Sequence, residues 1–346
     1  MELWKNRTGV LDHLEKGFYY EKLSSIQQKG YETVTNGIAA FQKRMQISDV
    51  SSKEEAEQII RAVAMEQFQF FYANLQQISI SQSGSQIFFS IEYIYDKKKT
   101  AELKRQIEEK ADFILSQIIM DDMDDYEKCQ AVHDYITENI RYNFSALSVS
   151  YVYDAFTVEG ALLKKQAVCM GIAKGIAYLL NRLGIYNLIV CGSSDIDGNR
   201  INHAWNMARQ GGNYYHIDAT WDLQEINHFT NHSHMYFNLD DDAMLTNHFW
   251  ELQDYPNCDS NFENYYVREK RFFRSIHSFE LYVRQFLKEK QIYMDIKFED
   301  TLDFADDGGE YVAGLIKKNA NYLGMSFQIS CIFNFYNYVF QAEITY

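Results

Sequence analysis

The chain has 346 residues, 47% of them apolar and 23% charged, so it can bury a sizeable core in two or three packed units. Its net charge of −15 argues against binding a nucleic-acid backbone, which needs a basic surface. No apolar run is long enough to span a membrane, and the charged N-terminus lacks a signal-peptide pattern. We expect a cytoplasmic protein with no membrane partner, or a secreted one if a leader has been removed.

The first predicted elements are helices around a short sheet. A helix is expected from Phe18 to Met45, and a second is expected to start at Ser52, where Glu55 completes a capping-box pattern. Alternating residues around Gly84 predict a hairpin, and a charged helix is expected from Thr100 to Ile119.

The middle of the chain begins with "DYEKCQAVHDYITENIRYN", a predicted helix that ends near Tyr142. After a loop that ends at Gly160, apolar residues recur with helical spacing from Cys169 onward, and Gly184 stands where a C-terminal cap belongs. Three strand-like runs follow: "NLIVCGS", "NHAWNMA" and "NYYHIDAT".

The last segment alternates between strand and helix patterns. A strand is expected over "NYYVREKRFF", a helix near 276–289, a strand over "IYMDIKF", a helix near 309–320 and then two final strands. This order is typical of a small α+β domain. The predicted domains are therefore 1–119, 120–260 and 261–346, the last of unknown role.

The five cysteines are scattered and form no CxxC pair, which fits reduced thiols better than a disulfide framework or a zinc knuckle. Within apolar patterns, a cysteine is most simply a small core residue. This interpretation applies to Cys129, Cys191 and Cys331.

Cys169 falls in the first turn of its predicted helix, where unpaired N–H groups and the helix dipole stabilise a thiolate. Inside a helix, Gly171 and Gly175 each cost about 0.8–1.0 kcal/mol relative to alanine. Another element or a substrate is therefore expected to approach the backbone there. Taken alone, the helix still favours an inert core cysteine over an activated thiol.

A nucleophilic thiol needs a base, and the base needs an orienting group. His203 and Asp218 lie on two alternating runs that a turn signal joins into a predicted hairpin. If Gln210 and Gly211 form a two-residue turn, His203 lies directly opposite Asp218. A register shift of two makes the pair diagonal, and a shift of one puts it on opposite faces. Each of these residues alone has a simple structural explanation, but a cysteine, a histidine and an aspartate in this arrangement are much harder to explain as a coincidence.

Three stretches together resemble the core of the transglutaminase-like superfamily of papain-type thiol enzymes. They are "YEKCQAVHDYITENIRYN", "AVCMGIAKGIAYLLNRLGI" and "NHAWNMARQGGNYYHIDATWD". The later "MYFNLDDDAML", with His248, is similar to an extension of bacterial members. The resemblance implies an α+β fold with a papain/transglutaminase-like core, in which a cysteine-bearing helix packs on an antiparallel sheet. An N-terminal α/β region and a small C-terminal α+β domain flank this core.

The resemblance also implies a thiolate at Cys169, a general base and acid at His203, and an orienting carboxylate at Asp218. We expect acyl transfer through a Cys169 thioester on a protein or peptide substrate, as in a cysteine peptidase or amidase. Protein-glutamine transglutaminase activity and a non-catalytic binding module are the alternatives. The sequence leaves the oligomeric state open.

The expected oxyanion hole differs from that of papain, because position 163 is leucine where the resemblance to papain calls for glutamine. The backbone N–H of Cys169 is one expected donor, and a second is expected from Tyr142 or another upstream aromatic residue. Trp205 shares a strand face with His203, where it either walls the cleft or is a core aromatic residue.

Several histidines follow the predicted sheet and suggest a zinc site, because imidazole and thiolate are suitable ligands. They are His228, His232, His234 and His248, with Cys258 beyond. Their spacing matches no compact zinc pattern. We therefore expect surface or packing histidines, with no metal and no cofactor.

Overall fold

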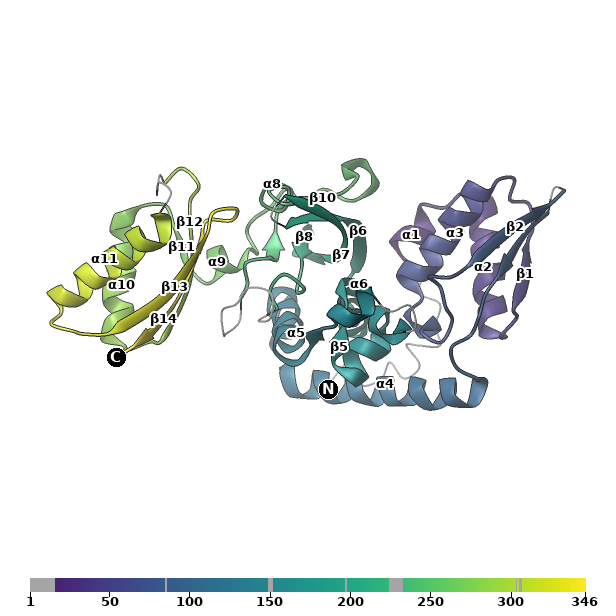
Figure 1. Ribbon diagram of the computed structural model, residues 1–346, viewed down its shortest axis with the longest axis horizontal. Coiled ribbons are helices and arrows are strands. Elements are labelled where there is room, and N and C mark those ends of the chain that lie inside the picture. Colours follow the sequence, from purple (N-terminus) through teal and green to yellow (C-terminus); the bar gives the residue numbers. More distant parts are fainter. Residues whose placement is uncertain are drawn as a thin grey trace. The chain divides into compact units, whose positions relative to one another are not determined.

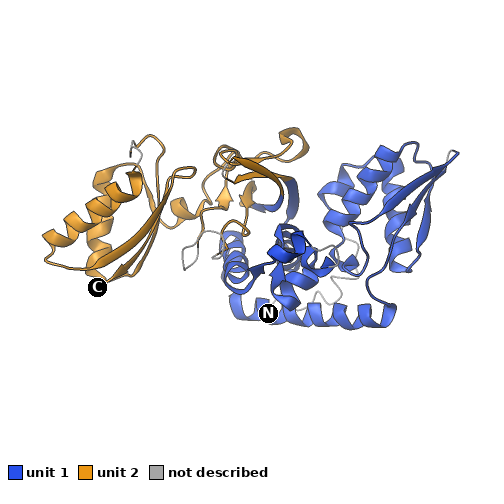
Figure 2. Ribbon diagram, in the orientation of Figure 1, with its two compact units in different colours: residues 1–191, 203–209 blue, residues 192–202, 210–346 orange. Residues whose placement is uncertain are grey.

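The computed structural model shows a mixed α+β protein, as expected from the sequence. Its elements form two compact units, which Figure 2 colours separately and which are described one at a time: residues 1–191 with 203–209, and residues 192–202 with 210–346. The structure describes residues 16–84, 86–148, 152–196, 198–223, 233–302, 304 and 307–346.

Unit 1 opens with helices beside a three-stranded antiparallel sheet of order β1-β3-β2 (Figure 1). The elements are α1 (Phe18–Glu21), α2 (Ser25–Ala39), β1 (Arg44–Ile47), α3 (Lys53–Glu66), β2 (Ser79–Ser83) and β3 (Gln86–Ser90). A 3₁₀ turn follows α3 at Phe68–Phe70.

The single helix predicted from Phe18 to Met45 is wrong, because the segment contains two helices and a strand. A capping box at Ser24 starts α2 as a new helix. Beyond its C-terminus, Phe41 adopts a left-handed φ of 61°, which turns the chain into β1. Neither feature follows from apolar spacing, which continues unbroken across both.

Two other predictions for this region, the start of a helix at Ser52 and the hairpin at Gly84, are confirmed. Ser52 caps α3 by accepting the N–H of Glu55, and Gly84, at a φ of 63°, turns the β2–β3 hairpin. The Glu55 carboxylate departs from the predicted capping box, because it accepts the backbone N–H of Ser51 instead of that of Ser52.

The rest of unit 1 packs around a central helix, α6. The long helix α4 contacts α5 and the segment before α6 (Figure 1). The bounds are α4 (Lys97–Ile118), α5 (Asp125–Asn139), β4 (Arg141–Tyr142), β5 (Gln166–Ala167) and α6 (Cys169–Leu183). These helices match the predicted ones, and Gly184 ends α6 with the left-handed φ of 77° that its position suggested.

A five-stranded sheet of order β10-β6-β7-β8-β9 follows α6. β10 runs antiparallel to β6, and β9 runs antiparallel to β8. The strands are β6 (Asn187–Ile196), β7 (Asn199–Gln210), β8 (Asn213–Ile217), β9 (Phe237–Leu239) and β10 (His248–Phe249), with α8 at Asp241–Met244.

The turn predicted at Gln210 and Gly211 is displaced by one residue. Gly211 and Gly212 connect β7 to β8 and have φ angles of 57° and 93°. Two positive φ angles suit a pair of glycines best. Gln210 is instead a buried strand residue whose amide exchanges hydrogen bonds of 2.8 and 2.9 Å with the amide of Asn238.

The last part of unit 2 is a four-stranded sheet of order β11-β12-β14-β13 with two helices against it (Figure 1). The segment predicted as one strand over "NYYVREKRFF" contains the short helix α9, which Asn264 caps, and only two residues of strand. The remaining predictions here are confirmed. The bounds are α9 (Tyr265–Arg268), β11 (Phe272–Phe273), α10 (Ile276–Lys288), β12 (Tyr293–Phe298), α11 (Gly308–Tyr322), β13 (Gln328–Asn334) and β14 (Val339–Thr345). Within the described residues, no helix is both long and apolar enough to span a bilayer.

Candidate active site

Cys169 is the first residue of α6 and is half-buried. Val168 precedes it in extended conformation, and no side chain caps the helix N-terminus. The N–H of Val168 donates to the carbonyl oxygen of Ala155 at 3.0 Å, which fixes the chain one residue before the cysteine. The thiol therefore sits where the dipole of a 15-residue helix favours a negative charge.

The glycines of α6 allow other elements to approach this helix closely. A Cβ at Gly171 would lie 2.2 Å from the carbonyl oxygen of Ala155, in the 3₁₀ turn Tyr153–Phe156. A Cβ at Gly175 would lie 2.9 Å from the Cβ of Ala161. The close approach predicted from the sequence therefore comes from neighbouring elements of unit 1.

Tyr142 lies beside the chain that leads into Cys169. It pairs with Ala167 in the parallel β4–β5 ladder, and its side chain packs against a small cluster that includes Val168. This ladder brings Tyr142 and the start of α6 together, although a role for Tyr142 in an oxyanion hole stays a prediction.

His203 lies on β7, in the same unit as Cys169. Its ring stacks on that of Trp205 with 5.8 Å between centroids, and both side chains are buried. One residue further on, the buried Asn206 donates from Nδ2 to the carbonyl oxygen of Ala173 in α6 at 3.0 Å. This bond ties the strand that carries His203 to the helix that begins with Cys169.

Asp218 directly follows β8 and is 1% exposed. Its Oδ1 accepts the backbone N–H of Thr220 at 2.9 Å, and its Oδ2 faces Nε2 of His248 at 3.0 Å. The sequence predicted Asp218 but not its contact with His248. The signal was weak, because the two residues lie 30 positions apart and a two-residue strand carries His248.

The second aspartate of the "DATWD" stretch, Asp222, is also buried. Its carboxylate accepts the Ser233 hydroxyl at 2.7 Å and the Tyr236 N–H at 2.9 Å. Trp221 packs with ring centroids 5.0 Å from Tyr236 and 4.8 Å from His248, which agrees with a packing role for this tryptophan.

The other four cysteines are poor candidates for a thiolate. Burial is the main reason that their thiol pKa values lie above the ordinary value. At neutral pH a thiol with a raised pKa stays protonated and unreactive. These residues are Cys129, Cys191, Cys258 and Cys331.

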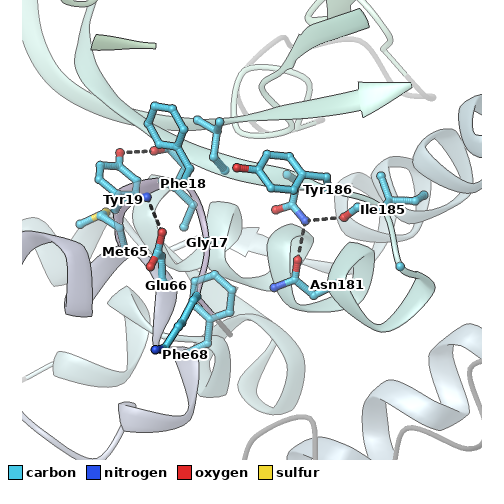
Figure 3. A pocket seen from close by; sticks show the side chains of 14 residues that line it. Gly17, Phe18, Tyr19, Met65, Glu66, Phe68, Asn181, Ile185 and Tyr186 are labelled. Carbon is cyan, nitrogen blue, oxygen red and sulfur yellow. Dashed lines mark hydrogen bonds between the residues drawn. The ribbon is translucent and has the colours of Figure 1, made fainter. Parts of the chain in front are cut away.

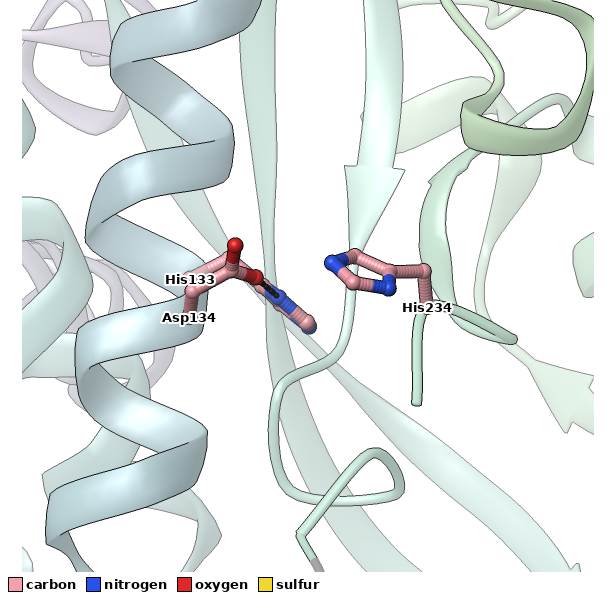
Figure 4. A group of neighbouring side chains, drawn as sticks. All are labelled: His133, Asp134 and His234. Carbon is pink, nitrogen blue, oxygen red and sulfur yellow. Dashed lines mark hydrogen bonds and ion pairs between the residues drawn. The ribbon is translucent and has the colours of Figure 1, made fainter. Parts of the chain in front are cut away.

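The histidines considered as zinc ligands serve other contacts where the structure describes them; His228 and His232 lie outside the described residues. His234 stacks on Tyr265 with 3.8 Å between centroids. Figure 4 shows its ring, and also the hydrogen bond of 3.0 Å between His133 and Asp134 on α5.

One group in unit 2 has a metal-like composition: His216, Asp241 and Cys258 offer ligand atoms within 4.8 Å of one another. Hydrogen bonds account for it, because Asp241 pairs with His216 Nε2 at 2.9 Å and with the backbone N–H of Cys258 at 3.0 Å.

A cavity of about 220 Å³ lies elsewhere in unit 1, between the start of α1 and the C-terminal end of α6 (Figure 3). Tyr19 and Glu66 line one side, and Asn181 and Tyr186 line the other. Burial raises the pKa of the Glu66 carboxyl to about 7. The cavity is separate from the candidate active site, because Cys169 lies at the opposite end of α6, roughly 20 Å away at 1.5 Å per residue.

The fold and this site have the arrangement of a thiol-enzyme core: a half-buried cysteine begins a helix, and a hydrogen bond joins that helix to a strand that carries a histidine. The family model of the transglutaminase-like superfamily matches residues 113–219. The matched residues include Cys169, His203 and Asp218, so the part of the chain that carries the three predicted site residues is the part that is similar to that superfamily. No curated protein matches the chain in sequence.

Three solved structures are similar to parts of the chain. A transglutaminase (TGase) shares 14% identity over 51% of this chain and 50% of its own, with a TM-score of 0.31. A candidate cysteine protease of Cytophaga hutchinsonii shares 16% identity over 42% of this chain and 61% of its own, with a TM-score of 0.28. A candidate protease of Parabacteroides distasonis ATCC 8503 shares 12% identity over 40% of this chain and 35% of its own, with a TM-score of 0.25. The chain thus spans about half of the first protein, and these similarities assign no activity to it.

Proposed function

We propose that the protein is a thiol-dependent acyl-transfer enzyme that hydrolyses peptide or side-chain amide bonds, with Cys169, His203 and Asp218 as its catalytic triad. One observation carries the proposal: Cys169 begins α6, and β7, which bears His203, is bonded to the same helix through Asn206 and Ala173. His203 lies on β7 and Asp218 directly follows the neighbouring strand β8, an arrangement that suits a carboxylate orienting an imidazole.

In the proposed reaction the Cys169 thiolate attacks the carbonyl carbon of the amide and forms a C–S bond. The C–N bond then breaks, and the imidazolium of His203 gives its proton to the leaving amine. Water attacks the resulting thioester while His203 takes a proton from it. The C–S bond then breaks, which releases the carboxylic acid and restores the Cys169 thiolate beside the imidazolium of His203. The Cys169 backbone N–H and a donor near Tyr142 are the proposed oxyanion contacts.

Cross-linking is the second candidate, because the same thioester transfers its acyl group to an amine when one reaches it before water. A non-catalytic binding module is the third candidate. The presence of all three residues argues against it, because a decayed site tends to lose at least one member.

The test compares the five thiols in the folded protein. Iodoacetamide at neutral pH is expected to label Cys169 well before the other four, whose pKa values are raised by burial. Peptide mass spectrometry gives the rate at each site, and Cys169→Ala should abolish turnover in a peptide-library screen whereas Cys191→Ala should not. Equal, slow labelling of all five thiols contradicts the proposal.

A further inference from the structure

The Asp218 carboxylate belongs to a buried chain of hydrogen bonds within unit 2. His248 faces Asp218 Oδ2 through Nε2 at 3.0 Å, and its Nδ1 lies 2.7 Å from Oδ1 of Asn247. Asn247 in turn donates from Nδ2 to the Tyr236 hydroxyl at 2.6 Å. The side chains of His248 and Asp218 are 0% and 1% exposed, so water does not compete for these contacts.

The surrounding structure holds the imidazole in one orientation. His248 opposes Ser194 in the antiparallel β10–β6 ladder, and the Asn247 carbonyl accepts the N–H of Asp195 at 2.8 Å. The ring packs against Trp221 and Tyr236, with centroids at 4.8 and 5.4 Å. Backbone pairing and aromatic packing together leave the ring little freedom to turn away from Asp218.

The chemistry of the pair fixes the direction of the bond. An ionised carboxylate only accepts hydrogen bonds, so the proton between the two groups is on Nε2 of His248, whichever way the Asn247 amide is turned. Such a charge-assisted bond favours the ionised form of a buried carboxyl. Full burial also separates His248 from solvent and from any substrate, so it does not act as a catalytic base.

Two other titratable groups near Asp218, His216 and Tyr236, stay neutral at pH 7. Burial is the largest effect: it leaves the pKa of His216 below its ordinary value and that of Tyr236 above its ordinary value. The negative charge of Asp218 raises the pKa of both His216 and Tyr236, and that of Asp222 also raises the pKa of Tyr236. The contact of 3.0 Å with His248 Nε2 therefore gives Oδ2 of Asp218 a hydrogen-bond donor.

We propose that His248 is a positioning residue, which holds the Asp218 carboxylate ionised and in one rotamer so that it can orient the catalytic imidazole. This inference rests on the proposed function, because it assigns Asp218 to the triad. It adds a fourth polar side chain that acts only through Asp218.

The experiment needs no substrate: the rate of Cys169 alkylation by iodoacetamide is measured from pH 4 to 10 in the full chain, by peptide mass spectrometry. His248→Leu removes the donor, His248→Gln keeps an N–H group, and Asp218→Asn is the reference. His277→Leu, at an exposed position of α10, controls for loss of a histidine. Circular dichroism and thermal melting establish that each variant is folded at the assay temperature.

His248→Leu and Asp218→Asn are expected to move the acid limb of the profile upward by about one pH unit, a loss of about tenfold on that limb. The double variant should lose no more than either single one, because both act on one interaction. His248→Gln should keep most of the rate, and His277→Leu should match the wild type.

Two contrary results have different meanings. A folded His248→Leu variant with the wild-type profile, beside a shifted Asp218→Asn variant, overturns the role of His248 and leaves the proposed function standing. Additive losses in the double variant also overturn it. If Cys169 in the wild type titrates as an ordinary thiol and Asp218→Asn changes nothing, both the proposed function and this inference fail.

Discussion

A buried carboxylate stays ionised only where hydrogen-bond donors replace the water that it has lost. Asp218 meets this condition, with the Thr220 N–H on one oxygen and the His248 ring on the other. The sequence could identify Asp218, because its distance from His203 suits a hairpin. It could not identify the donors, because the His248 contact depends on how β10 pairs with β6.

Glu66 gives a prediction for the pH dependence of stability. Burial raises its pKa from an ordinary value of 4.5 to about 7, although the N–H groups of Tyr19 and Tyr20 donate to the carboxylate. The folded protein thus binds this proton more tightly than the unfolded chain does. The stability that it contributes is complete below pH 4.5 and is lost as the pH rises through 7.

Glu66→Gln removes this dependence, because an amide does not ionise but still accepts from both N–H groups. Relative to wild type, we expect the variant to gain up to about 3 kcal/mol in unfolding free energy between pH 4.5 and pH 8. Urea denaturation at both pH values measures the change. Glu57→Gln, on the exposed side of α3, is the matched control, and an equal change in the two variants rules the argument out.

Gly171 allows a test of the close contact behind Cys169. A Cβ there would lie 2.2 Å from the Ala155 carbonyl oxygen, so Gly171→Ala forces backbone to move. We expect a loss of about 1–3 kcal/mol in unfolding free energy and slower alkylation of Cys169. Gly314→Ala in α11, where a Cβ meets nothing within 4 Å, should instead stabilise the protein by about 1 kcal/mol. Guanidinium titrations compare the two, and a stabilised Gly171→Ala variant counts against the contact.

At the scale of elements, sequence patterns predicted correctly those helices and strands whose bounds depend on interactions within one short segment. α6 was correct because apolar spacing, a terminal glycine and a first-turn cysteine all belong to one short segment. The start of α2 and the helix α9 were missed because single residues, Ser24 and Asn264, redirect the backbone within an apolar pattern. The turn after β7 was misplaced because Gln210 looks like a turn residue until Asn238 satisfies its amide.

The link between α6 and β7 carries an element-scale prediction. Asn206→Asp replaces the donor to the Ala173 carbonyl with a carboxylate that repels it, in a site with no exposure. We expect a loss of at least about 2 kcal/mol in unfolding free energy and slower Cys169 alkylation. Asn206→Ala, which lacks the repulsion, should lose less of both. Thermal melting and labelling rates show which variant loses more stability and more Cys169 reactivity. A larger loss in Asn206→Ala than in Asn206→Asp would argue that the bond to Ala173 does not hold β7 against α6.

At the scale of the whole molecule, one hydrophobic cluster of the described residues lies entirely within the last segment. Its members run from Phe273 on β11 to Ile344 on β14 and include the helices α10 and α11. Hydrophobic burial is the main favourable term in folding, so a segment with its own core is able to fold by itself. This observation supports the predicted boundary at residue 261, which otherwise stays a prediction.

A fragment of residues 261–346 is therefore expected to fold cooperatively when it is expressed alone. It keeps the buried Asp295 carboxylate and two donors to its Oδ1, the Tyr266 hydroxyl at 2.9 Å and the Gln341 amide at 3.3 Å. It loses the His234 ring that covers Tyr265, so its melting temperature should fall below that of the full chain. Circular dichroism melting and dispersed amide resonances identify a folded fragment, and Phe279→Ala, in its core, should abolish the transition. A fragment without a transition, even with stabilising sulfate present, means that the segment needs the rest of unit 2 to fold and that 261 is not a domain boundary.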